Sequence, residues 1–574
     1  MASGDRGRVG PAHVLKAIPS VPLLYFVVLV GVLVLVHELG HFVWAKFFGV
    51  RVLTVSIGFG PRIAGFRRGE TEYVISLLPL GGYVRMLGDN PRDTVAPGEQ
   101  ERSFAQQSPW RRFLIITGGP AMNLTFPVVL YFIVFLGDAR LTPSSVGTVF
   151  PNRPASGKLV AGDVVTAIDG ASVATFDELS RIVEGSPGVP LRFEVLRDGK
   201  RVETTITPVK AAKELPLELV RQVGRIGVMP NHPAAVVGVG SLASPAGASR
   251  LRTFDVIVAA AGRPVERWVD LERALAGNPG SLVPLTFLRP TPVPNALGGL
   301  AEIDVYEPRV AALTPEPGQG SAVARAGLEL ADLYVNHVRA GSPEHAIGLL
   351  PGDRLLELDG RPIQLWATFL EDLRAGGGKS HVLRWRRGGE EYSGRFELER
   401  QQGVTDEGQI YDRHIVGMRN WVPTRVDAPV PNPHPITYAM RQAVRATLDV
   451  VELTVYSVVR LVQGRLSVKT IGGPLAMLEY AGSAAREGPL NYLTLMAFIS
   501  VNLGLLNLLP IPLLDGGHLV FVFIESIARR PPSLRIREYA HIAGLALLLA
   551  LMTLAFKNDI ERLWPAIMEQ LEGG

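Results

Sequence analysis

Two histidines and a glutamate lie close together near the N-terminus, inside an apolar stretch. The stretch runs from Tyr25 to Phe48 and contains His37, Glu38 and His41 as an H-E-x-x-H motif. Residues four apart share one face of an α-helix, so both imidazoles can bind the same metal ion. Glu38 lies beside them, where its carboxylate can take a proton from a water that the metal activates. The motif therefore predicts a hydrolytic metal site.

The apolar surroundings distinguish this motif from a chance match, which is frequent in long proteins. A bilayer is crossed by about 20 helical residues, and this run is long enough. A charge near the centre of a membrane helix costs roughly 3 kcal/mol, so Glu38 requires a function. The soluble-protease form of the motif fits poorly, because Trp44 and Phe47 stand where a metzincin has glycine and histidine.

Composition limits the remaining possibilities. The chain has 574 residues, of which 47% are hydrophobic, and a mean hydropathy of +0.21, which fits a membrane portion joined to soluble modules. The net charge of +4 and the lack of a recognisable motif predict no nucleic-acid partner. Cysteine is absent, so any metal must be held by histidine and carboxylate. We expect the first apolar run to be retained rather than cleaved as a signal peptide, since cleavage would remove the motif.

A second polar cluster lies far along the chain, in another apolar segment. The sequence from Asn507 to His518 reads N-L-L-P-I-P-L-L-D-G-G-H, and its prolines must interrupt helical hydrogen bonding. Catalytic zinc sites take three protein ligands and keep one position for water. The candidates for the third ligand are Asp515, His518 and Glu525. Asp515 is favoured because it follows the break, where its carboxylate can be aimed.

A different third ligand remains possible. In a soluble-type zinc site on a membrane tether, Glu70 or Glu72 would complete the set. These two residues belong to a segment that is rich in β-formers and continues through Gly81 and Gly82. We interpret that segment as a β-hairpin or small curved sheet at the membrane face. Its edge could pair with an extended substrate strand through Tyr83, Val84, Arg85 and Met86.

The charge pattern predicts the topology. Arginines are frequent between residues 46 and 112 and again between 529 and 537, which places both loops in the cytoplasm. The basic N-terminal tail argues mildly the other way. The fold class that follows is a multi-domain membrane protein. It has an α-helical transmembrane core of about four spans with a membrane-associated β-hairpin or sheet, and α+β domains inserted between spans 2 and 3.

The inserted region repeats. Two copies share a short strand, a turn and a second strand from Asp163 to Gly170 or from Asp353 to Gly360, each followed by an amphipathic helix. A fainter middle copy has Phe254 in place of the glycine before its aspartate. The pattern resembles bacterial PDZ domains, which bind extended peptides or chain ends at a sheet edge. The alternative is that the copies are spacers or lids. The stretch from Pro290 to Gly320 is interpreted as a linker or loop.

The predicted divisions are 1–48, tail and first span with the H-E-x-x-H motif; 49–112, cytoplasmic β region; 113–138, second span; 144–210, first PDZ; 225–310, degenerate middle PDZ; 325–402, third PDZ; 403–435, linker; 436–486, amphipathic helices at the membrane interface; 493–525, third span; 540–558, fourth span; and 559–574, C-terminal tail.

Three motifs together resemble the site-2 protease family of intramembrane zinc metalloproteases. They are H-E-x-x-H in the first span, G-G-Y-V-R-M in the hairpin and N-x-x-P-x-P-x-L-D-G in the third span. The sequence is most similar to the family's bacterial sigma-E regulator proteases. The resemblance covers Tyr25 to Asn123 and Ile436 to Asp559. It implies that His37, His41 and Asp515 bind Zn²⁺, that Glu38 is the catalytic base, and that Asn507 steadies the substrate backbone.

The resemblance also implies a substrate and a location. The substrate would be a single-span membrane protein already trimmed outside, such as an anti-sigma factor or a signal-peptide remnant. The enzyme would lie in the bacterial inner membrane, with periplasmic PDZ domains that exclude bulky substrates. A third PDZ copy departs from the best-known members, which have two, and puts the geometry of this gating in doubt. The competing hypothesis is a membrane-anchored PDZ scaffold whose metal site is lost or merely structural.

Overall fold

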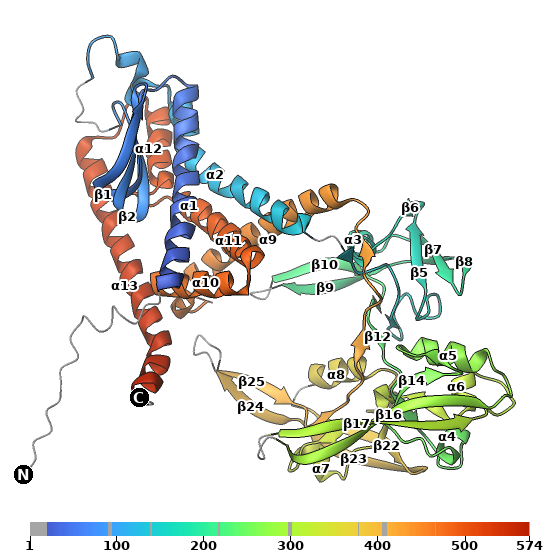
Figure 1. Cartoon of the computed structure of the whole chain (residues 1–574). Coiled ribbons are helices and arrows are strands. Elements are labelled where there is room, and N and C mark those ends of the chain that lie inside the picture. Colours follow the sequence, from blue (N-terminus) through green and yellow to red (C-terminus); the bar gives the residue numbers. More distant parts are fainter. Residues whose placement is uncertain are drawn as a thin grey trace, which may run out of the picture. The chain divides into compact units, whose positions relative to one another are not determined.

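The computed structural model describes residues 20–89, 95–137, 140–215, 219–296, 301–376, 378–404, 410–464 and 466–572. The chain divides into two compact units, one formed by Met1–Ala139 with His434–Gly574 and the other by Arg140–Pro433. The first unit is mainly helical and combines the two ends of the chain, whereas the second consists mainly of strands (Figure 1).

The helical unit is organised around α2. Its helices are α1 (Ser20–Phe47), α2 (Pro109–Leu136), α9 (Pro435–Val462), α10 (Pro474–Glu487), α11 (Pro489–Asn507), α12 (Asp515–Ala528) and α13 (Leu534–Glu572). α2 packs against α1, α9, α11 and α12. It approaches α1 closely, because a Cβ added to Gly40 would lie 2.1 Å from the carbonyl oxygen of Gly118. Glycines at such a crossing let two helix backbones touch, as is common in membrane proteins.

Within the described residues of this unit, four helices are long and apolar enough to cross a membrane. They are Pro22–Phe47, Pro109–Leu136, Pro489–Asn507 and Leu534–Arg562, with mean hydropathies of 2.3, 1.8, 1.5 and 2.0. Between a fifth and a third of the first three spans is buried within the protein, and only 11% of the last. Helices that expose so much apolar surface are suited to lipid rather than to water.

The end of the chain differs from the expected tail at 559–574. α13 continues as a helix to Glu572. The reason is tertiary: Asp559 is fully buried and accepts hydrogen bonds of 2.9 to 3.2 Å from the backbone N–H groups of Gly473, Leu475 and Ala476. These groups begin α10 and have no partner within that helix. α13 therefore extends past the expected span and caps α10 from outside.

The strands β1 (Val52–Arg68) and β2 (Thr71–Met86) form one antiparallel sheet that folds back on itself. Val55 pairs with Val84 on one side and with Tyr73 on the other. The end of β1 pairs only with the beginning of β2. Residues 82–86 therefore pair on one side with β1 and form an edge of the sheet, which is a template for a further strand.

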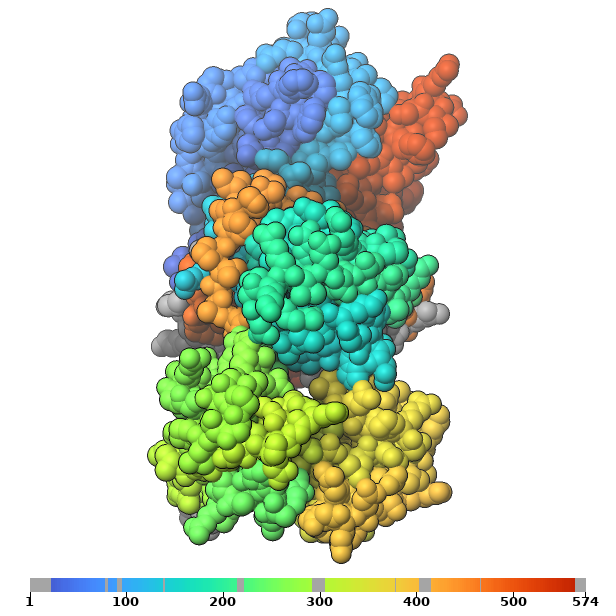
Figure 2. Space-filling view, turned by 90° about the vertical axis from the view of Figure 1, so that its right-hand side faces the viewer, coloured from blue at the N-terminus to red at the C-terminus, as the bar shows by residue number. Residues whose placement is uncertain are grey.

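The strand unit contains three copies of one design, which we call the first, middle and third repeats. Their four-stranded sheets have the equivalent orders β6-β5-β7-β8, β15-β14-β16-β17 and β21-β20-β22-β23. Their main helices are α3, α5 and α8. In the space-filling view the three repeats form separate lobes, coloured teal, light green and gold (Figure 2).

The elements of the first repeat are β4 (Thr148–Val149), β5 (Val164–Ile168), β6 (Ala171–Ser172), α3 (Phe176–Glu184), β7 (Leu191–Arg197), β8 (Lys200–Ile206), β9 (Val209–Leu215), β10 (Leu219–Arg225) and β11 (Val228–Met229). Those of the middle repeat are β13 (Val237–Val239), α4 (Pro245–Ala248), β14 (Val256–Ala260), β15 (Arg263–Pro264), α5 (Trp268–Ala276), β16 (Val283–Ala296), β17 (Ala301–Leu313), α6 (Ala322–Arg325) and β18 (Leu328–Leu330). Those of the third repeat are β19 (His337–Val338), α7 (Pro343–Ala346), β20 (Arg354–Leu358), β21 (Arg361–Pro362), α8 (Trp366–Ala375), β22 (Ser380–Arg387), β23 (Glu390–Glu397), β24 (Glu399–Val404), β25 (Ile410–Ile415) and β26 (Met418–Arg419).

The same ion pair between a buried aspartate and an arginine occurs in all three repeats. Its members are Asp163 with Arg197, Asp255 with Arg289, and Asp353 with Arg387, each joined by two hydrogen bonds of 2.6 to 2.8 Å. The middle repeat thus has the same internal structure as its neighbours although its sequence diverges. Phe254 adopts φ +74°, close to the +92° and +93° of the glycines at the equivalent positions of the other repeats.

Each repeat extends beyond its expected C-terminal boundary. The first strand of each pairs with a closing strand, in the combinations β4–β11, β13–β18 and β19–β26. The closing strands begin at Val228, Leu328 and Met418, past the expected ends at 210, 310 and 402. The expected linker 403–435 is also not a plain linker, because β25, β26, β27 (Thr424–Arg425) and β28 (Val430–Pro431) lie within it. Of these, β27 pairs with β12 (His232–Pro233) and β28 with β3 (Arg140–Leu141).

The stretch from Pro290 to Gly320, expected to be a linker or loop, forms much of the long hairpin β16–β17. Prolines are tolerated in β16 because they occupy only even-numbered positions, whose main-chain groups face the same side of the strand. The carbonyl of Pro284 accepts a hydrogen bond from Ala261 on the β14 side. Pro290 and Pro292 follow Pro284 by an even number of residues. They therefore face the same side of β16 as Pro284, and their backbone nitrogens are directed away from β17. β14 has already ended there, so no ladder hydrogen bond is lost.

Candidate metal centre

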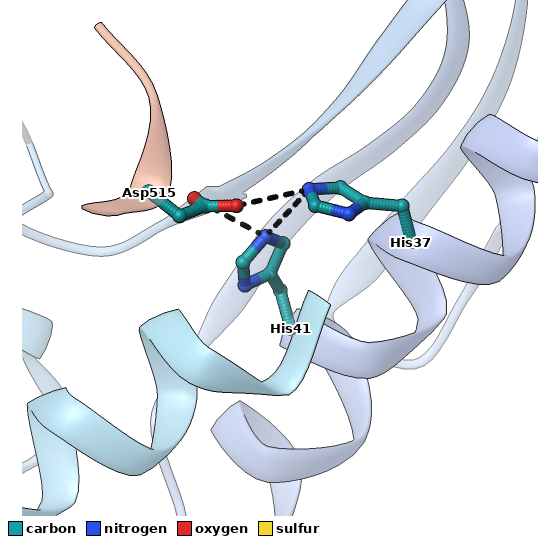
Figure 3. Close-up of side chains that lie close together, drawn as sticks. All are labelled: His37, His41 and Asp515. Atoms are coloured by element: carbon teal, nitrogen blue, oxygen red, sulfur yellow. Dashed lines mark hydrogen bonds and ion pairs between the residues drawn. The ribbon is translucent and has the colours of Figure 1, made fainter. Parts of the chain in front are cut away.

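Three metal-binding side chains from opposite ends of the sequence meet in the helical unit. The Nε2 atoms of His37 and His41 lie 3.2 Å apart. The Asp515 carboxylate lies 3.1 Å from Nε2 of His37 and 3.6 Å from Nε2 of His41. Figure 3 shows both rings and the carboxylate turned toward one point. Among the residues that the structure describes, this is the one cluster of at least three such groups that could hold a metal ion.

The donor set fits zinc. Nδ1 of His41 lies 2.9 Å from the carbonyl oxygen of Ile115, which can only accept, so the proton is on Nδ1 and Nε2 presents a lone pair. Two nitrogen lone pairs and a carboxylate repel one another at separations of 3.1 to 3.6 Å. A cation or a proton between them removes this repulsion. At a Zn–N distance of about 2.0–2.1 Å, tetrahedral geometry separates two nitrogens by roughly 3.3 Å.

The local sequence explains how each element supplies its ligand. α1 is continuous, so residues 37 and 41 project from one face. α11 ends at Asn507, the chain stays non-helical through Pro510 and Pro512, and Leu513 adopts φ +128°. α12 restarts at Asp515. The expected break is therefore present, and it brings the carboxylate to the two imidazoles.

Glu38 lies between the ligand cluster and the edge of the β sheet. It is only 9% exposed and is close enough to His37, His41 and Asp515 to interact with their charges. Its carboxylate accepts a hydrogen bond from the backbone N–H of Val84. A Cβ on Gly82 would lie 3.3 Å from Glu38 Cγ, so the edge strand runs directly beside this side chain.

The other expected substrate contacts surround the same place. Asn507, the last residue of α11, has its Nδ2 3.5 Å from both ring nitrogens of His37, too long on either side for a strong hydrogen bond. Along the edge strand, Tyr83 and Arg85 are exposed and Val84 is half-buried. The side chain of Met86 is buried against Val52, and its backbone N–H donates a 3.0 Å hydrogen bond to Oδ2 of Asp89.

Comparison with known proteins identifies the family. The model of peptidase family M50 matches residues 25–551. The chain belongs to peptidase family M50. The predicted site-2 protease family is thereby confirmed.

Relatives of this M50 peptidase match along nearly their whole length. The regulator of sigma-E protease RseP of Escherichia coli is 29% identical over 552 residues, which cover 94% of this chain and 98% of that protein. The RseP protein of Salmonella typhimurium is 28% identical with the same coverage. A relative from Neisseria meningitidis, whose name describes a zinc metalloprotease, is 29% identical over 94% of this chain and 99% of its own. This chain is a zinc metalloprotease.

Among solved structures, the PDZ domain of an SdrC-like protein from Listeria innocua matches with 24% identity and a TM-score of 0.13. It covers 15% of this chain and 91% of that domain.

The remaining candidates for a third ligand of the M50 site are engaged elsewhere. Glu525 forms a two-fold ion pair with Arg112 of α2, at 2.6 and 3.0 Å. His518 packs edge-on against His541, with ring centroids 5.7 Å apart. Neither belongs to the ligand cluster. The Arg112–Glu525 pair instead ties α12 to α2.

The alternative site on the β region is disfavoured for the same reason. Glu70 accepts hydrogen bonds from Lys46 at 2.7 Å and from Arg102 at 2.7 and 2.8 Å. These cations lower the pKa of the Glu70 carboxyl below its ordinary value. Glu72 is paired with Arg62. Both carboxylates are structural partners of nearby cations.

One polar contact of the site was not anticipated. Asn123 of α2 is fully buried, and its Nδ2 lies 3.2 Å from Nδ1 of His37. Asn123 is not among the site residues that the sequence predicted. The available signal was an amide side chain in a span that otherwise reads as apolar, where a polar group is costly unless it has a partner.

Proposed function

We propose that this metalloprotease cleaves single-span membrane proteins within or at the edge of the bilayer, with zinc held by His37, His41 and Asp515. The observation that carries the proposal is the convergence of these three side chains inside the unit that contains all four apolar helices. A soluble zinc peptidase would not place its ligands on helices suited to lipid. Residues so distant in sequence have no local reason to meet there.

The chemistry assigned to the chain's own residues is proton transfer and positioning. A zinc ion in this site supplies a Lewis acid that polarises the scissile carbonyl and acidifies water. Glu38 is the base, because its carboxylate is buried beside both imidazoles. It takes a proton from the attacking water and later delivers that proton to the leaving amide nitrogen. The amide of Asn507, weakly engaged with His37, donates a hydrogen bond to the substrate backbone.

The substrate is held in an extended form. The amides of a transmembrane helix are already paired, so the segment must unwind before its carbonyl can be attacked. The edge formed by residues 82–86 pairs with β1 on one side only and runs directly beside Glu38, whose carboxylate accepts a hydrogen bond from the N–H of Val84. We assign the substrate strand to this edge, formed by Tyr83, Val84, Arg85 and Met86. Only alternate residues of a strand turn their main-chain groups to the same side, so Val84 would hydrogen-bond the substrate backbone while Tyr83 and Arg85 would flank it with their exposed side chains.

The names of the relatives and the proposed topology support one substrate class. Relatives are named regulators of sigma-E, which suggests an anti-sigma factor or a similar single-span remnant that was trimmed outside. The basic loops at 46–112 and 529–537 favour a cytoplasmic location for both. The repeats would then lie in the periplasm and the protein in the bacterial inner membrane.

Two of the three repeats have an open groove. In the first repeat a cavity of about 290 Å³ lies between α3 and residues 224–229. In the third, a cavity of about 590 Å³ lies between α8 and residues 414–420. β11 and β26, which line these cavities, each pair on one side only with a described strand. Arginines that would meet the carboxylate of a chain end line both grooves. They are Arg225 in the first repeat and Arg374 and Arg419 in the third, whereas Arg153 of the first groove is paired with Glu371.

The equivalent place in the middle repeat is filled by the chain itself. α6 packs against α5. Its Ala322 and Val323, together with Ala326, are buried in one core with Leu271 and Leu275 of α5. We therefore assign extended-peptide binding to the first and third repeats and a spacer role to the middle one.

Tryptophan substitutions at one helical position can test this assignment. Ser180, Glu272 and Leu370 occupy equivalent positions of α3, α5 and α8. In the full chain, Ser180→Trp and Leu370→Trp should each remove one class of binding site for a fluorescent peptide with a free apolar C-terminus. Each should weaken its site at least about tenfold, because burying one apolar side chain is worth roughly 1.5–3 kcal/mol. Fluorescence polarisation measures both effects. Glu272→Trp should leave binding unchanged, and loss of binding in that variant alone would contradict the assignment.

The proposed activity is tested with purified full-length protein in lipid vesicles. A single-span protein with a short external end is expected to be cut inside its apolar segment, as mass spectrometry of the products will show. A chelator should stop the reaction and added zinc should restore it. Cuts confined to residues outside the apolar segment would overturn the intramembrane assignment. Peptide binding without any cleavage would instead favour the scaffold hypothesis.

A further inference from the structure

One face of α2 touches both histidines of the metal centre. Ile115, Gly119 and Asn123 follow each other at intervals of four residues and so lie along a single stripe of the helix. The carbonyl of Ile115 contacts Nδ1 of His41 at 2.9 Å, and the amide of Asn123 contacts Nδ1 of His37 at 3.2 Å. Both imidazoles of α1 are therefore held from behind by the same neighbouring helix.

Gly119 provides the clearance between these two contacts. A Cβ at this position would lie 2.4 Å from Nε2 of His41 and 2.8 Å from Cε1 of His37. Both distances are far inside van der Waals contact. Any larger residue would displace the rings from the point at which their Nε2 atoms converge.

Asn123 is buried and anchored through its backbone, as suits a residue that orients a neighbour. It is 0% exposed, and its backbone carbonyl accepts a 2.8 Å hydrogen bond from Oγ of Ser500 on α11. Its Oδ1 is buried and has no hydrogen-bond partner among the described residues. A buried amide in apolar surroundings costs free energy unless it is satisfied, so its contact with His37 requires an explanation.

The protonation state of a metal-binding histidine supplies that explanation. When Nε2 of a neutral imidazole gives its lone pair to a metal, the proton is on Nδ1, which must then donate. An amide offers an acceptor as well as a donor, and the two are exchanged by rotating the group by half a turn. The oxygen that now lacks a partner would then face Nδ1 of His37. Asn507 is a poorer candidate, because its 3.5 Å distances to both ring nitrogens favour neither.

We propose that Asn123 is a positioning residue that orients His37 for the metal by accepting a hydrogen bond from its Nδ1, with Gly119 keeping the space that both rings need. The inference rests on the proposed zinc site. It assigns the orientation of both histidines to α2, which itself supplies no ligand.

The test compares two substitutions by zinc affinity, measured in competition with a chromogenic chelator on the full-length protein. Asn123→Leu should weaken zinc binding about 10–100-fold, the usual effect of losing a residue that orients a metal-bound histidine. Asn123→Asp keeps an acceptor and no donor, and it should bind zinc at least as tightly as the parent. The absorption bands of the Co²⁺-substituted protein should shift in Asn123→Leu and be retained in Asn123→Asp.

Further variants keep the outcome decisive. Thr125→Val changes an exposed residue of α2 and should leave zinc affinity unchanged. Gly119→Ala should weaken zinc binding independently of Asn123. If Asn123→Leu does not fold, the result with Asn123→Asp decides between the two outcomes. Loss of zinc binding in Asn123→Asp would show that His37 does not need a hydrogen-bond acceptor at residue 123, and would overturn the inference. Unchanged affinity in Asn123→Leu would overturn the inference. A parent protein that binds no zinc would instead contradict the proposed function itself.

Discussion

Glu38→Gln is expected to lower the rate of peptide cleavage by about 10²–10⁴-fold, the range attributed to a single positioned acid–base group. The amide has the size of the carboxylate but cannot take a proton from water. Zinc binding should be retained, because the ligand cluster consists of His37, His41 and Asp515 and does not include residue 38. The measurements are initial rates on a single-span substrate in vesicles and the zinc content of the same samples.

A matched control is Glu487→Gln, which removes an exposed carboxylate at the end of α10 in the same unit. It should cleave at the parent rate. A Glu38→Gln protein that still cleaves normally would show that Glu38 is not the base. If Glu38→Gln instead lost its zinc, the side chain would be needed for the metal centre rather than for proton transfer.

Asp515→Ala is expected to release the metal. The substitution removes the single carboxylate of the cluster and leaves two neutral imidazoles with Nε2 atoms 3.2 Å apart. Zinc affinity should fall by more than about 100-fold, beyond the 10–100-fold effect typical of residues that only orient a ligand. Elemental analysis of the purified protein gives the zinc-to-protein ratio, and cleavage should be lost in parallel.

His518→Ala and Glu70→Ala discriminate between this site and its alternatives. His518 lies one helical turn after Asp515 but packs on His541, and Glu70 is paired with Lys46 and Arg102. Both variants should keep zinc at the parent ratio. Undiminished zinc in Asp515→Ala, combined with loss of zinc in either control, would move the third ligand to that residue.

The part of the site within one helix could be predicted directly. His37, Glu38 and His41 are fixed relative to each other by the helical repeat, so their spacing alone indicates a shared metal. The third position could not be settled by local reasoning, because Asp515, His518 and Glu525 all occur within or next to the same apolar segment. The choice depends on α12 packing against α2, where Arg112 engages Glu525 and the break at Pro510 and Pro512 turns Asp515 toward α1.

In the repeats, too, local features could be predicted from the sequence and long-range ones could not. Asp163 and Asp353 in equivalent Asp-Gly-containing segments predicted two copies, because turn chemistry is local. The closing strands, the hairpin after Pro290 and the filled groove of the middle repeat involve partners distant in sequence, and local patterns did not indicate them.

The sequence by itself therefore determined which atoms could bind a metal, which segments suit a membrane and which turns recur, because residue type and helical spacing are local properties. Only the tertiary structure decided which carboxylate meets the two imidazoles, that one stripe of α2 lies against both rings, and which grooves are open. Those features depend on how surfaces far apart in the chain pack together, and packing follows the shapes of both partners rather than the pattern of either one.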